Sequence, residues 1–397
     1  MKSDLKTDAN IKKFYIITAL AAFAFYTPIS QLFFLDRGLT IFDMAMMGVV
    51  WTVVKMVLEI PSSIVADRWG RKQVLLMSTF LTVLQIVTVI FARSFPIFVL
   101  ASIWSAAAYA FRSGTDVAFF YDSLKAQNKE KDFEKLWAKQ QVYSQVPFVI
   151  SFLCSGFLFA VSPTIPYWLS LVFLLISGAL TFTLVEPKIY SPVGAELKFL
   201  GQIKESLLFI FKDVNLRFIL LFVLMFSLGS DISYGYGQIY LKYLSLPVVL
   251  FGVVFTLKSF VCTVAANMVP RLRKKFSLAT LFGFQIGGIT LAYYMMVLTK
   301  NYWVGAGAII LIAIPHGFFE ISKSSYLHQR IQSHQRATID SMFSFILSVI
   351  FLVVEPIIGL LADRYSIKMP FWGVAGVLTV YGVYYLTNGY KRLEVTK

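Results

Sequence analysis

Apolar runs recur along the whole chain, and each is about 20 residues long, which lets a helix cross the roughly 30 Å hydrocarbon core of a bilayer. Membrane β-strands would instead give shorter segments in which apolar and polar residues alternate. The runs therefore predict an all-α integral membrane protein. Its twelve transmembrane helices are expected near residues 14–35, 44–66, 73–92, 96–121, 136–161, 164–185, 216–241, 246–270, 278–298, 302–325, 337–362 and 370–389.

Composition agrees with this class and excludes several others. Hydrophobic residues make up 58% of the chain and charged residues 14%, far from the usage of soluble domains. The run at 14–35 lacks a small-residue cleavage site, so it is interpreted as the first span and not as a signal peptide. Cys154 and Cys262 lie far apart, and the three histidines make no ligand spacing with them. We therefore expect no disulfide framework, no metal site and no cofactor.

The basic residues predict the orientation. With both termini inside, the cytoplasmic segments hold 25 Lys and Arg residues and the outer loops hold six. Positive charge gathers on cytoplasmic loops, so the net charge of +15 reports orientation and not nucleic-acid binding. The expected location is the cell inner (cytoplasmic) membrane, crossed many times, with both termini in the cytoplasm.

The longest polar interruption, residues 186–214, divides the chain into two six-helix bundles at 1–185 and 215–397. Its segment "LKFLGQIKESLLFIFKD" has apolar residues at helical spacing with lysines between them. This pattern favours a cytoplasmic linker whose helix lies in the membrane interface.

The two halves are related by an internal repeat. A shift of 204 residues aligns "GVVWT" (48–52) with "GVVFT" (252–256) and "PYW" (166–168) with "PFW" (370–372). The basic turn "DRWGRK" (67–72) falls on "RLRKKF" (271–276) in the same register. Two parallel repeats predict a substrate site between the halves near the membrane midplane.

These features resemble the major facilitator superfamily (MFS) over the whole chain, in the manner of bacterial twelve-helix drug/proton antiporters. The sharpest match is "SSIVADRWGRK": the family's loop between helices 2 and 3 reads Gly-x-x-x-Asp-Arg-x-Gly-Arg-Arg/Lys, with Ser63 in place of its first glycine. The matching residues are Asp67, Arg68, Gly70, Arg71 and Lys72.

The resemblance implies a conformational latch at this loop. It places Asp67 at the start of helix 11 and directs Arg71 to an acidic residue at the end of helix 4, where Asp122 stands. A carboxylate at a helix N-terminus would stabilise one packing of the halves and release in the other. The alternative is a basic turn that only sets orientation.

Ionisable residues inside the spans are the candidates for proton coupling or substrate binding, because such groups are costly in a bilayer unless they line a pathway. Arg112 and Asp116 are four residues apart and are expected on one face of helix 4. At the shift of 204 their counterparts are His316 and Glu320. Ion pairs that only fix packing remain the alternative.

Three further carboxylates are candidates for the same roles. Glu59 stands four residues after Lys55 and close to Pro61, and Glu355 precedes Pro356. Asp231 lies in "SLGSDISYGYGQIY", whose glycines predict a flexible or broken helix that acts as a gate or a binding wall. Ordinary helix packing is the alternative for all three.

Secondary transport by alternating access is the leading interpretation, since the sequence has no Gly-x-x-x-x-Gly-Lys-Ser/Thr run for ATP. The resemblance implies a proton-coupled exporter of small amphipathic compounds. However, "QVYSQVPFVISFLCSGFLF" keeps only Pro147 and Gly156 of the antiporter pattern in helix 5. Proton-coupled uptake of a small solute or siderophore therefore stays open, as does a transport-dead sensor.

An enzyme is not expected, because no nucleophile with its base is visible. The expected partners are a small molecule, protons and the lipid bilayer, with the protein acting as a monomer.

Overall fold

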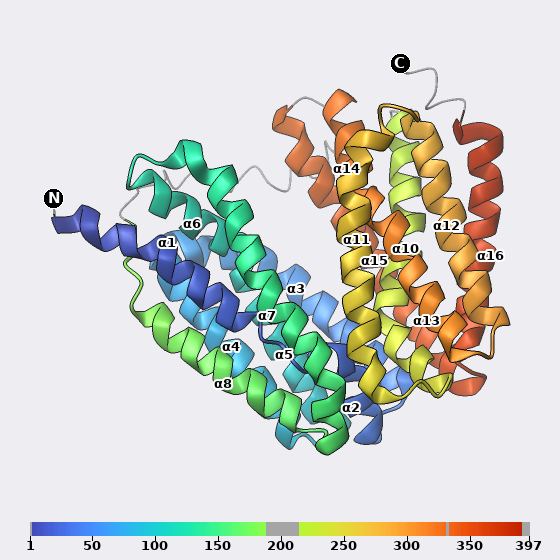
Figure 1. Ribbon diagram of the computed structural model, residues 1–397, viewed down its shortest axis with the longest axis horizontal. Coiled ribbons are helices and arrows are strands. Elements are labelled where there is room, and N and C mark those ends of the chain that lie inside the picture. The colour runs from blue at the N-terminus through green and yellow to red at the C-terminus, as the bar shows by residue number, and fades with distance from the viewer. Residues whose placement is uncertain (1, 188–213, 331–332, 391–397) are drawn as a thin grey trace. The chain divides into compact units, whose positions relative to one another are not determined.

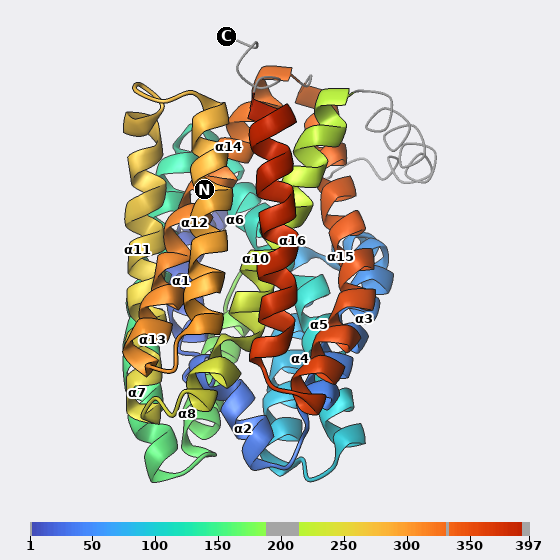
Figure 2. The same cartoon turned by 90° about the vertical axis from the view of Figure 1, so that its right-hand side faces the viewer.

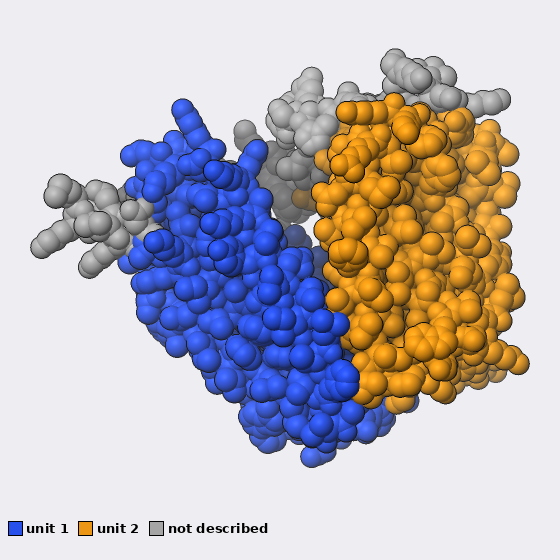
Figure 3. Space-filling model, in the orientation of Figure 1, with its two compact units in different colours: residues 1–193 blue, residues 194–397 orange. Residues whose placement is uncertain are grey.

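The computed structural model describes residues 2–187, 214–330 and 333–390, and within them it contains helices and no strands. The chain forms two compact units, residues 1–193 and 194–397, which Figure 3 colours blue and orange. The predicted linker at 186–214, with its interfacial helix, lies almost wholly outside the described residues and stays a prediction.

Unit 1 contains helices of very different length (Figure 1). Two 3₁₀ turns, η1 (Thr27–Ile29) and η2 (Glu130–Asp132), lie among the α-helices. The α-helices are α1 (Lys2–Ala21), α2 (Ser30–Asp36), α3 (Ile41–Trp69), α4 (Arg71–Phe91), α5 (Phe95–Arg112), α6 (Thr115–Lys125), α7 (Phe133–Val161) and α8 (Ile165–Phe182).

The described part of unit 2 begins with one continuous helix and includes a 3₁₀ turn at η4 (Val248–Leu250) and a π-helical end at η5 (Tyr385–Gly389). Its α-helices are α10 (Val214–Tyr243), α11 (Phe251–Leu272), α12 (Leu278–Leu298), α13 (Tyr302–Leu311), α14 (Ala313–Arg330), α15 (Ser333–Arg364) and α16 (Lys368–Tyr384).

The two units repeat one packing pattern, as parallel repeats should. In unit 1, α4 packs against α5 and α8, and α3 packs against α5. In unit 2, α12 packs against α13 and α16, and α11 packs against α13 and α14. Figures 1 and 2 both show α12 and α16 side by side along their lengths. The internal repeat of the sequence is thus also a repeat of tertiary contacts.

Ten helices in the described part of the chain are long and apolar enough to cross a membrane, and Ile165–Thr181 is a shorter apolar helix. The expected first span, unlike these helices, is interrupted. Residues 14–35 were predicted to form one helix, but α1 ends at Ala21 and the chain resumes through η1 into α2. The prediction of a continuous first helix is therefore wrong.

Pro28 stands in η1, just after this break. A proline inside a helix lacks the N–H for the ladder, and its ring clashes with the carbonyl four residues earlier, which here belongs to Ala24. The backbone freed by the break must find other partners in a bilayer. One is Ser170 of α8, whose hydroxyl oxygen accepts a hydrogen bond from the Phe25 amide at 2.9 Å.

The corresponding helix of unit 2 is unbroken, so of the flexible or broken helix predicted around Asp231 the broken form is excluded. Gly229, Gly235 and Gly237 were expected to loosen the helix around Asp231, yet α10 runs continuously from Val214 to Tyr243. Glycine weakens a helix by only about 1 kcal/mol and does not remove a hydrogen bond. Gly229 instead permits close packing, since a Cβ there would meet Ile289 at 2.9 Å.

A second break separates the two residues expected on one face of helix 4. The chain leaves α5 after Arg112, turns at Gly114 with φ +76°, and starts α6 at Thr115. The left-handed conformation at Gly114 ends the helix, because residues with a Cβ rarely adopt it. Arg112 and Asp116 therefore do not share one continuous helix.

Candidate functional site

Unit 2 holds a cavity of about 200 Å³ between α10, α14 and α15. Its walls combine ionisable side chains with phenylalanine rings. The charged or titratable lining residues are Asp231, His316, Glu320 and Lys323, and the aromatic ones are Phe226, Phe319 and Phe343. Three of the sequence-predicted candidates, Asp231, His316 and Glu320, are thus brought to one cavity.

One face of α10 supplies the polar wall of this cavity. Ser227, Ser230 and Asp231 recur at intervals of three and four residues, which places them on one side of a helix. Ser230 Oγ shares a hydrogen bond of 2.7 Å with His316 Nδ1 on α14. The serine fixes the orientation of the imidazole ring, because the bond ties one ring nitrogen to α10.

Glu320 forms its ion pair with Lys323, and not with His316, which stands four residues before it on α14. Glu320 Oε2 lies 3.0 Å from Lys323 Nζ, at i,i+3 on α14. The Glu320 side chain is 64% exposed, whereas that of Lys323 is 17% exposed. Lys323 also lies over the Phe319 ring at 5.5 Å. The carboxylate is therefore open to the cavity while its lysine partner is held against the wall.

Lys258 of α11 belongs to the same electrostatic cluster. Its Nζ lies 5.5 Å from the centroid of the Tyr234 ring, an arrangement in which the π-face attracts the ammonium group. Asp231 interacts electrostatically with both Lys258 and Glu320. Sequence analysis did not single out Lys258. The available signal was its position as an ionisable residue inside an apolar run.

Glu355 lies on α15, one residue before Pro356. The Tyr236 hydroxyl of α10 donates a short hydrogen bond to Glu355 Oε2. Glu355 also interacts electrostatically with Asp231. Four predicted candidates, Asp231, His316, Glu320 and Glu355, are therefore coupled within unit 2, and Tyr236 is a partner that the sequence did not reveal.

The remaining candidates lie in unit 1. Arg112 Nε and Asp116 Oδ2 are 3.8 Å apart, so the pair forms across the α5–α6 break. Glu59 is exposed on α3. Lys55 lies over Trp51 at 5.8 Å and over Tyr109 at 5.5 Å rather than against Glu59, within the part of unit 1 that the structure describes. The Lys55–Glu59 pairing is thus not formed.

The basic turn between α3 and α4 is organised by two carboxylates. Arg71 Nη1 forms an ion pair with Asp122 Oδ2 of α6, as the resemblance implied. Glu186, which sequence analysis did not single out, accepts hydrogen bonds from the backbone amides of Arg71 at 2.8 Å and Lys72 at 2.7 Å. A carboxylate there satisfies free N–H groups at the start of α4 and complements the helix dipole.

The other residues of the turn that the resemblance singled out are Gly70, Arg68 and Asp67. Gly70 has φ +94° between α3 and α4, which favours glycine at that position. Arg68 is exposed. The side chain of Asp67 lies outside the described residues, so its expected contact with helix 11 stays a prediction.

The cavity of unit 2 is suited to bind charged or proton-exchanging groups. Two carboxylates, Asp231 and Glu320, lie beside Lys323 and His316 inside helices of membrane-spanning length. Ionisable groups in such a place mark ion or substrate pathways. Within the described residues, no group of three His, Cys, Asp or Glu side chains has metal-site geometry.

Comparison with known proteins identifies the family. The model of the Major Facilitator Superfamily matches residues 14–355. The chain belongs to this superfamily. It is therefore a multi-pass membrane transporter with the twelve-helix, all-α MFS fold, and the resemblance stated from the sequence is confirmed.

Similar proteins add detail to this assignment. The uncharacterized MFS-type transporter YxaM of Bacillus subtilis (strain 168) is 26% identical over 272 residues, which is 66% of this chain and 66%, just under two-thirds, of that protein.

Among solved structures, a mutant of the nucleoside transporter NupG has a TM-score of 0.80 at 14% identity, covering 96% of this chain and 99% of that one. A bacterial homolog of the human lysosomal transporter Spinster, inward-facing and unoccupied, has a TM-score of 0.72 at 14% identity over 96% of both chains. At these identities the likeness concerns the fold.

Proposed function

We propose that this transporter is a secondary active carrier that works by alternating access and exports small amphipathic organic compounds in exchange for protons. The observation that carries the proposal is the charged cluster around the unit 2 cavity. Asp231 and Glu320 are open to that cavity within membrane-spanning helices. Carboxylates so placed can take up and release protons when water reaches them from alternate sides.

Because the carboxylates interact with lysines, protonation of a carboxylate can change the structure of the site. Charged Asp231 attracts Lys258, and charged Glu320 attracts Lys323 at 3.0 Å. Protonation of either carboxylate removes that attraction and frees a lysine that packs against an aromatic ring. The favoured packing of α10, α11 and α14 then depends on protonation, which is the requirement for coupling.

The mixed lining also supports an amphipathic substrate. Phe226, Phe319 and Phe343 offer apolar contact, and the charged residues lie within the same cavity. A compound with an apolar body and a polar end matches both kinds of wall. We further propose that the protein lies in the cytoplasmic membrane with both termini inside, as the distribution of Lys and Arg predicts. We also propose that it acts as a monomer.

The turn at 67–72 is proposed to act as the conformational latch. The Arg71–Asp122 pair and the Glu186 cap fix the start of α4 and the end of α3 to the rest of unit 1. This rigid support holds the turn in place for Asp67 to engage or release another element. An Asp67→Asn variant is expected to shift labelling of cysteines engineered at the cytoplasmic mouth, and unchanged labelling would reject the latch.

Uptake of a small solute together with protons is the second candidate. It is favoured by a second cavity, in unit 1, which carries no ionised side chain among its lining residues. A structural neighbour, NupG, is a nucleoside transporter by name.

Internal pH in proteoliposomes separates the two directions. A panel of amphipathic cations, organic acids and neutral ring compounds is added outside while a trapped dye reports pH. Internal alkalinisation as a solute enters means antiport and supports the exporter working in reverse. Acidification means symport and supports uptake. The absence of any pH change with a solute that demonstrably enters would refute proton coupling.

A further inference from the structure

The cavity of unit 1 has a chemistry that the charged cluster does not explain. Its volume is about 250 Å³, and it lies between the broken first span, α3, α4, α5 and α8. The lining residues include four aromatic rings and several neutral polar groups. The rings belong to Tyr26, Phe34, Trp51 and Tyr167, and the polar side chains include Ser30, Gln31, Gln85, Ser102 and Ser105.

Three polar side chains in this wall make no hydrogen bond to any described residue. Gln85 lies in the middle of α4, and Ser102 and Ser105 lie in α5. Other serines in unit 1 use their hydroxyls locally: Ser151 donates to Phe148 O at 2.8 Å and Ser155 donates to Phe152 O at 2.7 Å. An amide without a partner in a membrane span is costly, so its exposure to the cavity indicates a partner from outside the chain.

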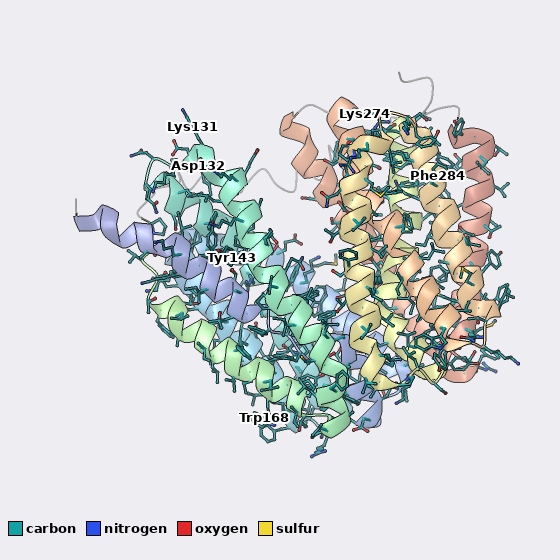
Figure 4. All side chains as sticks on the ribbon, in the orientation of Figure 1. Lys131, Asp132, Tyr143, Trp168, Lys274 and Phe284 are labelled. Carbon is teal, nitrogen blue, oxygen red and sulfur yellow. The ribbon has the colours of Figure 1, made fainter. Side chains whose placement is uncertain are left out.

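Tyr167 adds a fourth such group. Its ring stacks on Tyr26 at 5.1 Å and packs against Phe33 at 4.6 Å, and the residue is 1% exposed. Its hydroxyl has no hydrogen-bond partner within the described residues. The next residue, Trp168, lies at the outer surface of α8 (Figure 4), so the helix presents Tyr167 inward.

The internal repeat shows that the fold does not require this polarity. The equivalent residues of unit 2 occupy the corresponding helices and are buried, yet all are apolar. At the shift of 204, Gln85, Ser102, Ser105 and Tyr167 correspond to Ile289, Ala306, Ile309 and Phe371. Unit 2 thus packs the same helices with hydrocarbon where unit 1 places amide and hydroxyl groups.

We infer that the unit 1 cavity is a binding subsite for a neutral, flat, ring-bearing compound with hydrogen-bonding groups. The aromatic side chains contact the ring, and Gln85, Ser102 and Ser105 bond its polar atoms. A charged ligand is disfavoured, because no lining residue supplies a counter-ion. Arg37, whose charge reaches Tyr167, is engaged by the Phe33 ring at 4.7 Å and the carbonyl oxygens of Ile90 and Ala92.

The volume limits the size of the ligand. Ligand pockets commonly measure about 300–1,000 Å³, so a cavity of about 250 Å³ suits a compound of one or two rings. The inference rests on the proposed function, since it identifies the substrate class of the same transporter. Binding at this subsite differs from the proposed transport in needing no proton gradient, because all the residues that line it belong to unit 1.

The test is equilibrium binding to the full-length protein in detergent, with three indoles that share one ring and differ in charge. Neutral indole-3-ethanol is expected to bind at least about tenfold more tightly than cationic tryptamine or anionic indole-3-acetate. Gln85→Leu should weaken binding of indole-3-ethanol about fivefold to tenfold, the effect of one hydrogen bond. Ser105→Ala is a second variant with a smaller loss of the same sign.

Gln285→Leu is the matched control. Gln285 lies in α12, the counterpart of α4, but its amide donates to Ser322 Oγ at 3.2 Å and it does not line the cavity. We expect Gln285→Leu to lower the melting temperature and leave binding unchanged. Gln85→Leu should leave the melting temperature of the ligand-free protein unchanged or raised, since its amide makes no bond to the chain.

Equal affinity for the three indoles, or unchanged binding in both Gln85→Leu and Ser105→Ala, would overturn the inference. Binding as predicted without flux of the neutral indole in proteoliposomes would uphold the subsite and count against the proposed transport of such compounds. The two failures are therefore distinguishable.

Discussion

The cavity of unit 2 is lined by acidic and basic side chains, whereas the cavity of unit 1 is lined by neutral amides, hydroxyls and aromatic rings. The first cavity lies between α10, α14 and α15, and the second lies between the broken first span, α3, α4, α5 and α8. The two units therefore place their cavities at different positions of the repeated fold and line them with different chemistry. We assign proton exchange to unit 2 and recognition of a neutral ring to unit 1.

Backbone differs between the units as much as chemistry does. The first span of unit 1 is broken before Pro28, while α10 is continuous through Ile232, the residue at the equivalent position. The break places η1 and α2 beside the neutral cavity. The intact α10 instead keeps Ser227, Ser230 and Asp231 on one face. Each backbone form suits the cavity that it lines.

Ile232→Pro should have the largest effect, because it imposes the unit 1 backbone on unit 2. Ile232 is 1% exposed within α10, and proline there would clash with the Leu228 carbonyl. We expect a loss of about 3 kcal/mol or more of folding free energy, seen as a lowered thermal midpoint in detergent. Ile232→Val is the control, at about 0.5–1.5 kcal/mol. Equal midpoints for the two variants would refute proline as the cause of the break.

Asp231→Asn tests the assignment of proton exchange to unit 2 and of ring recognition to unit 1. The variant removes a carboxylate that can take up a proton and that attracts Lys258, so proton-coupled flux should fall roughly tenfold or more. Binding of the neutral indole in unit 1 should not change. Asp116→Asn makes the same substitution in unit 1 and should retain coupling. A coupled flux in Asp231→Asn equal to that of the unchanged protein would remove Asp231 from the mechanism.

Glu186→Gln tests a difference in how the equivalent helices begin. The start of α4 depends on distant Glu186, whereas α12 is capped locally by Ser277, whose hydroxyl accepts from the Thr280 amide at 3.1 Å. We expect Glu186→Gln to lower the free energy of unfolding by about 0.5–2 kcal/mol. The loss should be smaller at high salt, because salt screens the interaction of the carboxylate with the helix dipole. Ser277→Ala should cost a similar amount without salt dependence. Thermal unfolding at two salt concentrations measures both.

Arg112→Gln should have the smallest effect. The Arg112 side chain is 42% exposed and its 3.8 Å pair with Asp116 spans a helix break. Partly exposed ion pairs contribute about 0–1 kcal/mol, so thermal stability should scarcely change, and coupling should persist. A loss of coupled flux as large as that of Asp231→Asn would move the proton site into unit 1.

Local sequence patterns anticipated much of the architecture. Apolar runs, the basic turn and the 204-residue repeat predicted helices, family and two similar halves. The breaks were missed because hydropathy does not register hydrogen-bond loss at Pro28 or a left-handed turn at Gly114. The glycines around Asp231 had the opposite effect: they suggested a break where the helix is continuous, since Gly229 serves helix packing with Ile289.

For the site, the sequence selected residues but not their partners. Asp231, His316 and Glu320 were chosen because ionisable groups in a bilayer are costly, which is a property of each residue alone. Glu320 with Lys323, His316 with Ser230 and Glu355 with Tyr236 depend on which helix faces meet. The sequence by itself determined that this chain spans a membrane as repeated helices and where charge had to be accommodated. Tertiary structure decided which charges meet and where polar groups face a cavity without a partner, because those contacts join residues far apart in the chain.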